Sequence, residues 1–332
     1  MRVLILGGGG MLGRKLIDYL VKNANLDGIR VEAITSADAF ANSNSVISAN
    51  IEINHLVADI TDMQSCRQLV KSKPDLIYHL ASVVSGEAES NFEKGYQVNL
   101  DGTRNLFEAI KELSDDYCPR VIYTSSAAVF GPPYPDLIDD DFILQPTTSY
   151  GTQKVIGELL LNDYSRKGYF DGVGLRLPTI CVRPGKPNAA ASGVFSNIIR
   201  EPLSGQQAVL TVSSDTRMIF TSPKSAVGFL VHAAAIDTSV LAGRRSLTMP
   251  GVNATIADEI ESLRRIAGDQ IVALIKEEID QAAQKIVDNW NFPPVTAERA
   301  RHLGFTCESN FDEIIMSHID SELDGEILGG SK

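Results

Sequence analysis

Short apolar runs and amphipathic stretches alternate along the first half of the chain. The run from Val3 to Leu6 is continuously apolar, which is typical of a strand buried on both faces of a sheet. Further short apolar runs lie at residues 31–34, 56–58, 76–80, 121–123 and 173–177. Helical spacing of apolar residues separates several of them, most clearly at 96–113 and 150–164. Strands that alternate with helices predict right-handed crossovers, and therefore an α/β fold with a doubly wound parallel sheet.

This rhythm changes after Leu177. Prolines crowd the segment that follows, at positions 178, 184, 187 and 202, and such density disfavours regular alternation of strands and helices. We therefore expect a sheet domain from residues 1–178 and 225–250. A smaller, mostly α-helical cap is expected from residues 179–224 and 251–332.

Composition excludes several other classes of protein. Of the 332 residues 44% are apolar, so the chain can bury a sizeable core and disorder is not expected. The net charge of −12 argues against nucleic acid as a general partner, because binding to phosphates needs a basic face. No apolar stretch has the length of a membrane span, and the apolar run at the N-terminus is too short for a signal peptide.

The four cysteines are scattered, at positions 66, 118, 181 and 307. No Cys-x-x-Cys pair suggests zinc or a redox motif, and a disulfide framework would be unusual in so long a chain. We expect reduced thiols, no bound metal and a cytoplasmic location.

Five glycines follow the first predicted strand. Gly8, Gly10 and Gly13 fit the spacing G-x-G-x-x-G, and Gly7 in place of Gly8 gives G-x-x-G-x-x-G. Either spacing allows a tight turn, close approach of the backbone to a pyrophosphate and close packing of helix on strand. The anion would lie at the N-terminus of the helix that begins near Met11.

An acidic residue is expected at the end of the second strand, where it would bind the adenosine ribose of NAD. By register that position falls at Thr35 or Ser36, with Asp38 slightly beyond it, so the expected acid is missing. No arginine stands there to bind a 2′-phosphate, and NAD is therefore preferred to NADP. Asp59 follows the third strand, where it could contact the adenine edge or cap the next helix.

Ser125, Ser126, Tyr150 and Lys154 form the candidate catalytic set. The serines follow the strand predicted at 121–123, and ligands of open parallel sheets bind at the carboxyl ends of strands. Tyr150 and Lys154 are four residues apart on a predicted helix, so their side chains share one face. The ammonium favours the phenolate, a general base near neutral pH, and would also bind the nicotinamide ribose. A serine hydroxyl would hold the substrate oxygen while hydride passes from the carbinol carbon to nicotinamide.

With these residues the chain resembles the extended short-chain dehydrogenases/reductases, which include NAD-dependent epimerases and dehydratases, along nearly its whole length. The matching pieces are Gly7–Gly13, Asp59-Ile60, His79-Leu80-Ala81, residues 99–103, Thr124-Ser125-Ser126 with Val129-Phe130-Gly131, and Tyr150 to Lys154. The resemblance implies a Rossmann-type domain that binds NAD. It favours Ser126 over Ser125 as the catalytic serine, because Ser126 lies three residues before Val129-Phe130-Gly131.

The same resemblance implies a set of cofactor-binding residues and a homodimer. The implied residues are Gly7, Gly10, Met11, Leu12, Gly13, Asp59, Ile60, Leu80, Ala81, Ser82, Asn99, Tyr150, Lys154 and Pro178. The dimer would pair the helices at 97–113 and 150–164 with their copies in a four-helix arrangement.

Within that family, residues 81–89, 157–166 and 175–192 look closest to a subgroup that oxidises D-erythronate, a four-carbon sugar acid. This implies a small anionic substrate oxidised at its C2 hydroxyl to 2-oxo-tetronate. Such a substrate needs a carboxylate clamp, for which guanidinium groups are well suited. The candidate substrate-binding residues are Ser85, Ser126, Arg183, Lys186, Asn188 and Arg217. Arg183, Lys186 and Arg217 could instead be solvated surface charges and Asn188 a turn residue, whereas Ser85 follows the fourth strand and is expected to face cofactor or substrate.

Two other functions remain open from the sequence. A nucleotide-sugar 4-epimerase acting on UDP-hexoses would use the same scaffold with tightly bound NAD. A non-catalytic dinucleotide sensor would need the glycine turn alone, and the intact set of Ser126, Tyr150 and Lys154 weighs against it.

Overall fold

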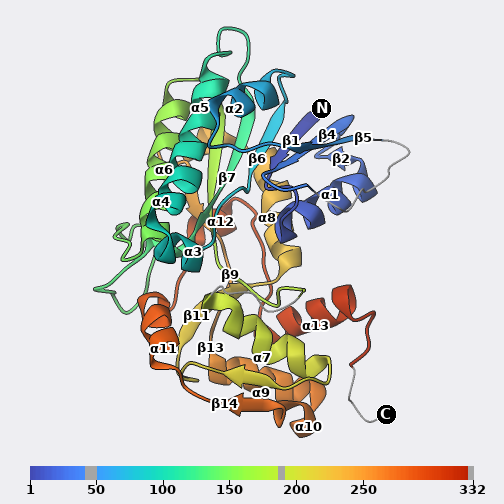
Figure 1. Ribbon diagram of the computed structural model, residues 1–332, viewed down its shortest axis with the longest axis vertical. Coiled ribbons are helices and arrows are strands. Elements are labelled where there is room, and N and C mark those ends of the chain that lie inside the picture. The colour runs from blue at the N-terminus through green and yellow to red at the C-terminus, as the bar shows by residue number, and fades with distance from the viewer. Residues whose placement is uncertain (42–50, 186–190, 328–332) are drawn as a thin grey trace. The chain divides into compact units, whose positions relative to one another are not determined.

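Strand β1 (Arg2–Leu6) lies inside a parallel sheet in the computed structural model, which describes residues 1–41, 51–185 and 191–327 (Figure 1). Within these residues seven strands form the sheet, all paired in parallel. Their spatial order is β12 (Ser246–Thr248), β8 (Asp171–Leu177), β7 (Arg120–Ser126), β6 (Leu76–His79), β1, β4 (Ala33–Asp38) and β5 (Glu52–Val57). The order reverses between β1 and β6, and ligands of such sheets bind at that switch point. The predicted α/β fold is confirmed.

Helices flank this sheet, and they follow the order expected of crossover connections. The elements are α1 (Met11–Asn23), α2 (Met63–Val70), α3 (Ser85–Ser90), α4 (Phe92–Gly95), a π-helix (Tyr96–Gly102), α5 (Thr103–Lys111) and α6 (Ser149–Arg166), with the short strands β2 (Asn25–Leu26) and β3 (Ile29–Arg30). Helices α5 and α6 lie side by side (Figure 1). Phe107 of α5 and Phe170, which directly precedes β8, are buried with ring centroids 4.8 Å apart.

The chain divides into two compact units. The sheet unit comprises residues 1–129, 148–177 and 227–248, and the cap unit comprises 130–147, 178–226 and 249–332. This grouping differs from the expected one at residues 130–147, which belong with the cap.

Contacts of the segment 130–147 explain its grouping. The Tyr134 hydroxyl donates to the Asn289 carbonyl at 3.1 Å, and Ile138 forms a β-bridge with Val295. These contacts join residues that are far apart in the sequence, so the hydrophobic pattern of a single segment cannot predict them.

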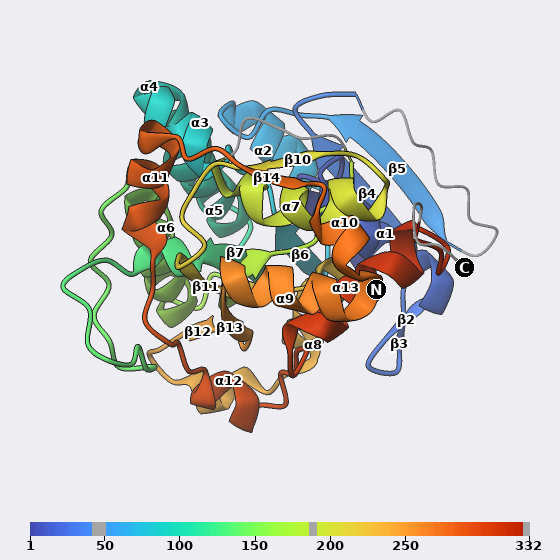
Figure 2. The same cartoon turned by 90° about the horizontal axis from the view of Figure 1, so that it is seen from below.

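The cap unit combines short strands with helices. It contains β9 (Thr179–Ile180), β10 (Ala208–Leu210), β11 (Arg217–Thr221), β13 (Val252–Thr255), β14 (Ile275–Glu277), α7 (Val194–Leu203), α9 (Ile256–Ala267), α10 (Asp269–Val272), α11 (Gln281–Val287), α12 (Glu298–His302) and α13 (Phe311–Glu322), and α8 (Pro223–Ala235) crosses from it into the sheet unit. Helix α9 packs against α7 and α13 (Figure 2). No helix among the described residues is long and apolar enough to cross a membrane.

Candidate active site

The turn between β1 and α1 has the geometry of a phosphate cradle. Gly7 has a φ of +81°, a conformation that favours glycine. A Cβ atom on Gly13 would lie 2.3 Å from the Gly7 carbonyl oxygen, so only glycine allows this packing of α1 on the turn. The helix begins at Met11, and its N-cap residue, Gly10, makes no side-chain cap. The first amides of α1, including those of Met11 and Leu12, therefore face the turn as donors for an anion, and the turn fits the pyrophosphate of a dinucleotide.

The acid expected after the second strand is present, because that strand is longer than the sequence suggested. Strand β4 continues beyond the apolar run at 31–34, through Thr35 and the buried Ser36 to Asp38. The Asp38 Oδ2 atom accepts a hydrogen bond from the Gly9 amide at 3.0 Å. Asp38 thus lies at the glycine turn, where a carboxylate can accept hydrogen bonds from an adenosine ribose.

Leu80, Ala81 and Ser82 directly follow β6, at the switch point of the sheet. Asn99 of the π-helix holds the loop after β6 in place by hydrogen bonds. Its Oδ1 atom accepts hydrogen bonds from the Ser82 hydroxyl at 2.8 Å and from the Val83 amide at 2.9 Å. π-Helices are rare and occur frequently at functional sites.

Gln153 completes this network and is not among the site residues predicted from the sequence. Its Oε1 atom accepts from Asn99 Nδ2 at 2.7 Å, and the residue is fully buried. The sequence does carry a signal for Gln153, because this residue lies between Tyr150 and Lys154 in the first turns of α6.

The remaining predicted cofactor residues occupy strand ends. Asp59 follows β5, is exposed, and accepts from the Thr61 amide at 2.9 Å, so its carboxylate shapes the turn before α2. Ile60 is buried, and Pro178 follows β8.

Tyr150 and Lys154 lie on the first turns of α6. The helix begins after Thr148, whose hydroxyl accepts from the Gly151 amide at 3.1 Å. Lys154 is 3% exposed, and its Nζ atom lies 5.4 Å from the centroid of the Tyr150 ring. The ammonium donates to the Thr124 carbonyl at 2.9 Å. Burial lowers the pKa of Lys154 to about 7, although the Glu158 carboxylate opposes this shift.

The two adjacent serines at the end of β7 have different partners. Ser125 is buried and donates its hydroxyl to Glu158 Oε1 at 2.5 Å. Ser126 is partly exposed, and its Oγ atom accepts from the Ala128 amide at 3.1 Å, which leaves the hydroxyl hydrogen to donate elsewhere. Ser126 therefore has the geometry of a donor to a substrate oxygen, beside the helix that carries Tyr150.

The predicted substrate-binding residues outside this set lie on several elements. Ser85 begins α3 in the sheet unit. In the cap unit, the Arg183 guanidinium donates to the Ile180 carbonyl at 3.0 Å and to the Ser192 hydroxyl at 2.8 Å.

Arg217 lies at the start of β11 and is partly exposed. Lys186 and Asn188 fall outside the described residues. Across the described ranges, no cluster of His, Cys, Asp and Glu is placed to hold a metal ion.

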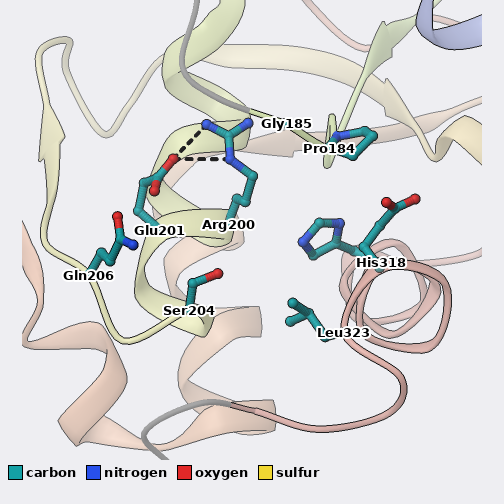
Figure 3. Close-up of a pocket in the computed structure, with 9 residues that line it drawn as sticks. Pro184, Gly185, Arg200, Glu201, Ser204, Gln206, His318 and Leu323 are labelled. Carbon is teal, nitrogen blue, oxygen red and sulfur yellow. Dashed lines mark hydrogen bonds and ion pairs between the residues drawn. The ribbon is translucent and has the colours of Figure 1, made fainter. Parts of the chain in front are cut away.

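A pocket of about 780 Å³ lies in the cap unit, and among the described residues that line it there is no predicted site residue. Arg200 and Glu201 of α7 line one side of it, and His318 and Leu323 line another (Figure 3). The Arg200 guanidinium is held by the Glu201 carboxylate at 2.6 Å and by the Arg183 carbonyl at 2.8 Å. Its charge is therefore already paired within the cap.

Comparison with curated proteins gives two similar relatives of nearly full length. One is D-erythronate dehydrogenase from Cupriavidus necator, which is 43% identical over 96% of this chain and 98% of the relative. The other is D-erythronate dehydrogenase from Haemophilus influenzae, which is 36% identical over 97% of this chain and 100% of the relative.

Among solved structures, one described as the nucleoside-diphosphate-sugar epimerase from Agrobacterium tumefaciens superimposes with a TM-score of 0.95. It is 52% identical and the match covers 98% of this chain and 96% of that one. L-threonine dehydrogenase from Clostridium difficile gives a TM-score of 0.83 at 23% identity over 98% of both chains, which shows a shared fold. The model of the NAD dependent epimerase/dehydratase family matches residues 3–239, and this chain belongs to that family.

Proposed function

We propose that this chain oxidises the C2 hydroxyl of D-erythronate to 2-oxo-tetronate with NAD as the hydride acceptor. The observation that carries the proposal is similarity along the whole chain, at 43% identity, to a D-erythronate dehydrogenase. It is supported by the placement of Ser126 at the end of β7 and of Tyr150 and Lys154 on α6, which packs against β7, in the same unit as the phosphate cradle.

Each catalytic side chain has a role that follows from its chemistry. Ser126 donates a hydrogen bond to the C2 oxygen and so orients the hydroxyl. The Tyr150 phenolate removes the hydroxyl proton, and the cationic Lys154 stabilises that phenolate. When bound, NAD supplies the electrophilic nicotinamide carbon that accepts the hydride from C2.

Asp38 supports NAD rather than NADP as the cofactor. Its carboxylate lies at the glycine turn, and a second negative group there would be repelled. The acid can instead accept hydrogen bonds from an unmodified ribose.

We also propose Arg217 as the residue that binds the substrate carboxylate. It is partly exposed, and no described residue accepts a hydrogen bond from its guanidinium. Arg183 already donates to two cap groups, so its guanidinium is more constrained. Lys186, Asn188 and Ser85 remain candidates for binding the carboxylate and hydroxyls.

The test is a panel of four-carbon and five-carbon sugar acids with NAD or NADP, followed by absorbance of the reduced cofactor. We expect turnover of D-erythronate with NAD and none in Tyr150→Phe. No turnover with any short sugar acid would contradict the proposal. An Arg217→Met variant should raise KM for the acid more than it lowers kcat.

A nucleotide-sugar 4-epimerase is the second candidate, favoured by the 52% identity to a structure described as a nucleoside-diphosphate-sugar epimerase. That activity would interconvert UDP-hexoses with no net change of cofactor. Incubation with UDP-hexoses and chromatography of the sugars distinguishes the two.

We further propose a cytoplasmic homodimer. All four cysteines are free thiols, as suits a reducing compartment. On α6, Leu159 is 63% exposed, and Val155 and Ile156 are partly exposed, so this helix presents an apolar strip that a second copy could cover.

A further inference from the structure

A buried carboxylate, that of Glu158, is held by two neighbours inside the sheet unit. The residue is 4% exposed, and its Oε1 atom accepts from the Ser125 hydroxyl at 2.5 Å. Arg176 donates from Nε to Oε1 at 3.0 Å and from Nη2 to Oε2 at 2.8 Å. The forked guanidinium therefore engages both oxygens, which fixes the orientation of the carboxylate.

The residues of this cluster come from the elements that carry the candidate catalytic set. Ser125 directly precedes Ser126 at the end of β7, and Arg176 lies near the end of β8. Glu158 lies on α6 one helical turn after Lys154, so the two side chains are neighbours on one face. A single carboxylate thus ties the strand that presents the serine to the helix that presents the base.

We propose that Glu158 is a positioning residue that acts through Lys154: its charge, held in place by Arg176 and Ser125, keeps the buried ammonium protonated beside the general base. The inference rests on the proposed function for the identity of the reaction. The arrangement itself can be tested without any substrate.

Lys154 needs such a counter-charge because it is buried. Burial disfavours the ammonium and lowers the pKa of Lys154 to about 7, even with the Glu158 carboxylate acting in the opposite direction. A neutral amine cannot stabilise a phenolate by charge. Loss of the Glu158 charge should therefore make Lys154 lose its proton at lower pH, and the phenolate should then form only at higher pH.

Among the described residues, the other titratable groups near Lys154 do not supply negative charge. The Tyr123 ring of β7 lies 5.2 Å from Nζ, and burial raises the pKa of its phenol well above the usual value, so it stays neutral. His79 of β6 is neutral as well, because burial and the charge of Lys154 lower its pKa to about 3. Arg176 is a cation. Glu158 is therefore the buried anion beside Lys154.

The experiment follows the ionisation of Tyr150 directly. It records the ultraviolet difference spectrum of tyrosinate between each protein and its own Tyr150→Phe derivative, against pH, without substrate or cofactor. In Glu158→Gln the transition is expected to move to higher pH by about one unit. With D-erythronate, the acidic limb of kcat/KM should move in the same direction, while KM changes by less than about two-fold.

A second variant separates this effect from loss of folding. Glu158→Gln leaves Arg176 buried without its carboxylate, which is destabilising. The double variant Glu158→Gln/Arg176→Gln removes both charges and is expected to fold and to show a smaller shift in the same direction. Glu158→Asp keeps the charge and should restore most of the wild-type profile. Asp163→Asn, an exposed residue of the same helix, is the matched control.

Two outcomes decide the matter. A folded double variant whose tyrosinate transition coincides with that of the wild type overturns the inference. Absence of turnover with every sugar acid contradicts the proposed function, and the tyrosinate titration then still decides the role of Glu158.

Discussion

Asp38 Oδ2 lies 3.0 Å from the amide nitrogen of Gly9, so the acid at the end of β4 is joined to the turn at the end of β1. The two strands are neighbours in register, with Leu6 opposite Ala37. Their carboxyl ends therefore coincide, and the residue after Ala37 reaches the glycine turn. The other oxygen, Oδ1, accepts from the Phe40 amide at 3.3 Å, which fixes the carboxylate from both sides.

Asp38 should determine the choice between the two nicotinamide cofactors. Asp38→Asn removes a charge that can accept hydrogen bonds from the ribose and that repels a 2′-phosphate. We expect kcat/KM with NAD to fall by about ten-fold to a hundred-fold, as for loss of a hydrogen bond to a charged group, and the preference over NADP to narrow. Steady-state kinetics with both cofactors measure this. Asp18 is exposed on α1, and Asp18→Asn should leave the ratio of kcat/KM with NAD to kcat/KM with NADP unchanged. If this ratio were the same in Asp38→Asn and Asp18→Asn, Asp38 would not determine the choice of cofactor.

The two serines of β7 form a matched pair for testing the catalytic assignment. Ser126→Ala should lower kcat by about 10²-fold to 10³-fold, as for removal of a donor to a reacting oxygen. Ser125→Ala should cost only a few-fold, because Arg176 still holds the Glu158 carboxylate. The measurement is kcat with saturating sugar acid and NAD. A larger loss in Ser125→Ala than in Ser126→Ala would reverse the roles.

Gly13 and Gly228 test the phosphate cradle. A Cβ atom on Gly13 would meet the backbone of Gly7, whereas one on Gly228 of α8 meets nothing within 4 Å. We expect Gly13→Ala to weaken binding of NADH by more than about ten-fold, since the turn must open where the backbone meets the pyrophosphate. Gly228→Ala should instead stabilise the fold by about 0.5–1 kcal/mol. Fluorescence titration with NADH and thermal unfolding are the two measurements, and wild-type affinity in Gly13→Ala would exclude a role for this turn in binding.

The buried carboxyl of Glu259 on α9 should make stability depend on pH. It is fully buried without a hydrogen-bond partner among the described residues, and burial, aided by Asp258, raises its pKa well above the usual value. The unfolded chain releases this proton above pH of about 4.3, whereas the folded chain keeps it. The contribution of this carboxyl to the free energy of unfolding should therefore be fully present below pH of about 4.3. It should fall as pH rises, by up to about 1.4 kcal/mol per pH unit.

Glu259→Gln removes that dependence, because the amide does not ionise. The difference in Tm between this variant and the wild type should grow in favour of the variant from pH 5 to pH 8. Glu261→Gln on the same helix, half-exposed, should show a constant difference. Parallel curves for Glu259→Gln and the wild type would mean that the carboxyl is not neutral in the folded protein.

Leu159 of α6 tests the proposed homodimer. A charge at this exposed apolar position would lie in the interface, so Leu159→Glu should give monomers in light scattering at micromolar concentration. Val240, which is 60% exposed away from α5 and α6, provides the matched control as Val240→Glu. A wild-type protein that is monomeric under the same conditions would contradict the proposed homodimer.

The sheet and the glycine turn could be predicted from the sequence, and the candidate catalytic residues could be assigned to a strand end and a helix, because each of these features has a local signal. A buried parallel strand such as Val3 to Leu6 is apolar throughout, and α6 has helical spacing. Asp38 was misjudged because β4 ends in polar residues, and Ser36 is buried although its type suggests a loop. Burial of such a side chain depends on neighbouring strands that no short window contains.

Other features depend on contacts between segments that are distant in the sequence, and the pattern of apolar and polar residues could not predict them. Glu158 looks like a surface charge of a helix until β7 and β8 bring Ser125 and Arg176 to it. The grouping of residues 130–147 with the cap rests on pairing with residues near 289–299.

The chain passes between the sheet unit and the cap unit at residues 129, 147, 177, 226 and 248. Both units are therefore assembled from separate pieces, and no single cut releases either of them intact. Exchange of the cap for that of a relative must replace 130–147, 178–226 and 249–332 together, with every junction preserved. A chimera made in this way is expected to keep the candidate catalytic residues Ser126, Tyr150 and Lys154 and tests whether the cap determines the choice of substrate, whereas a truncated chain should fail to fold.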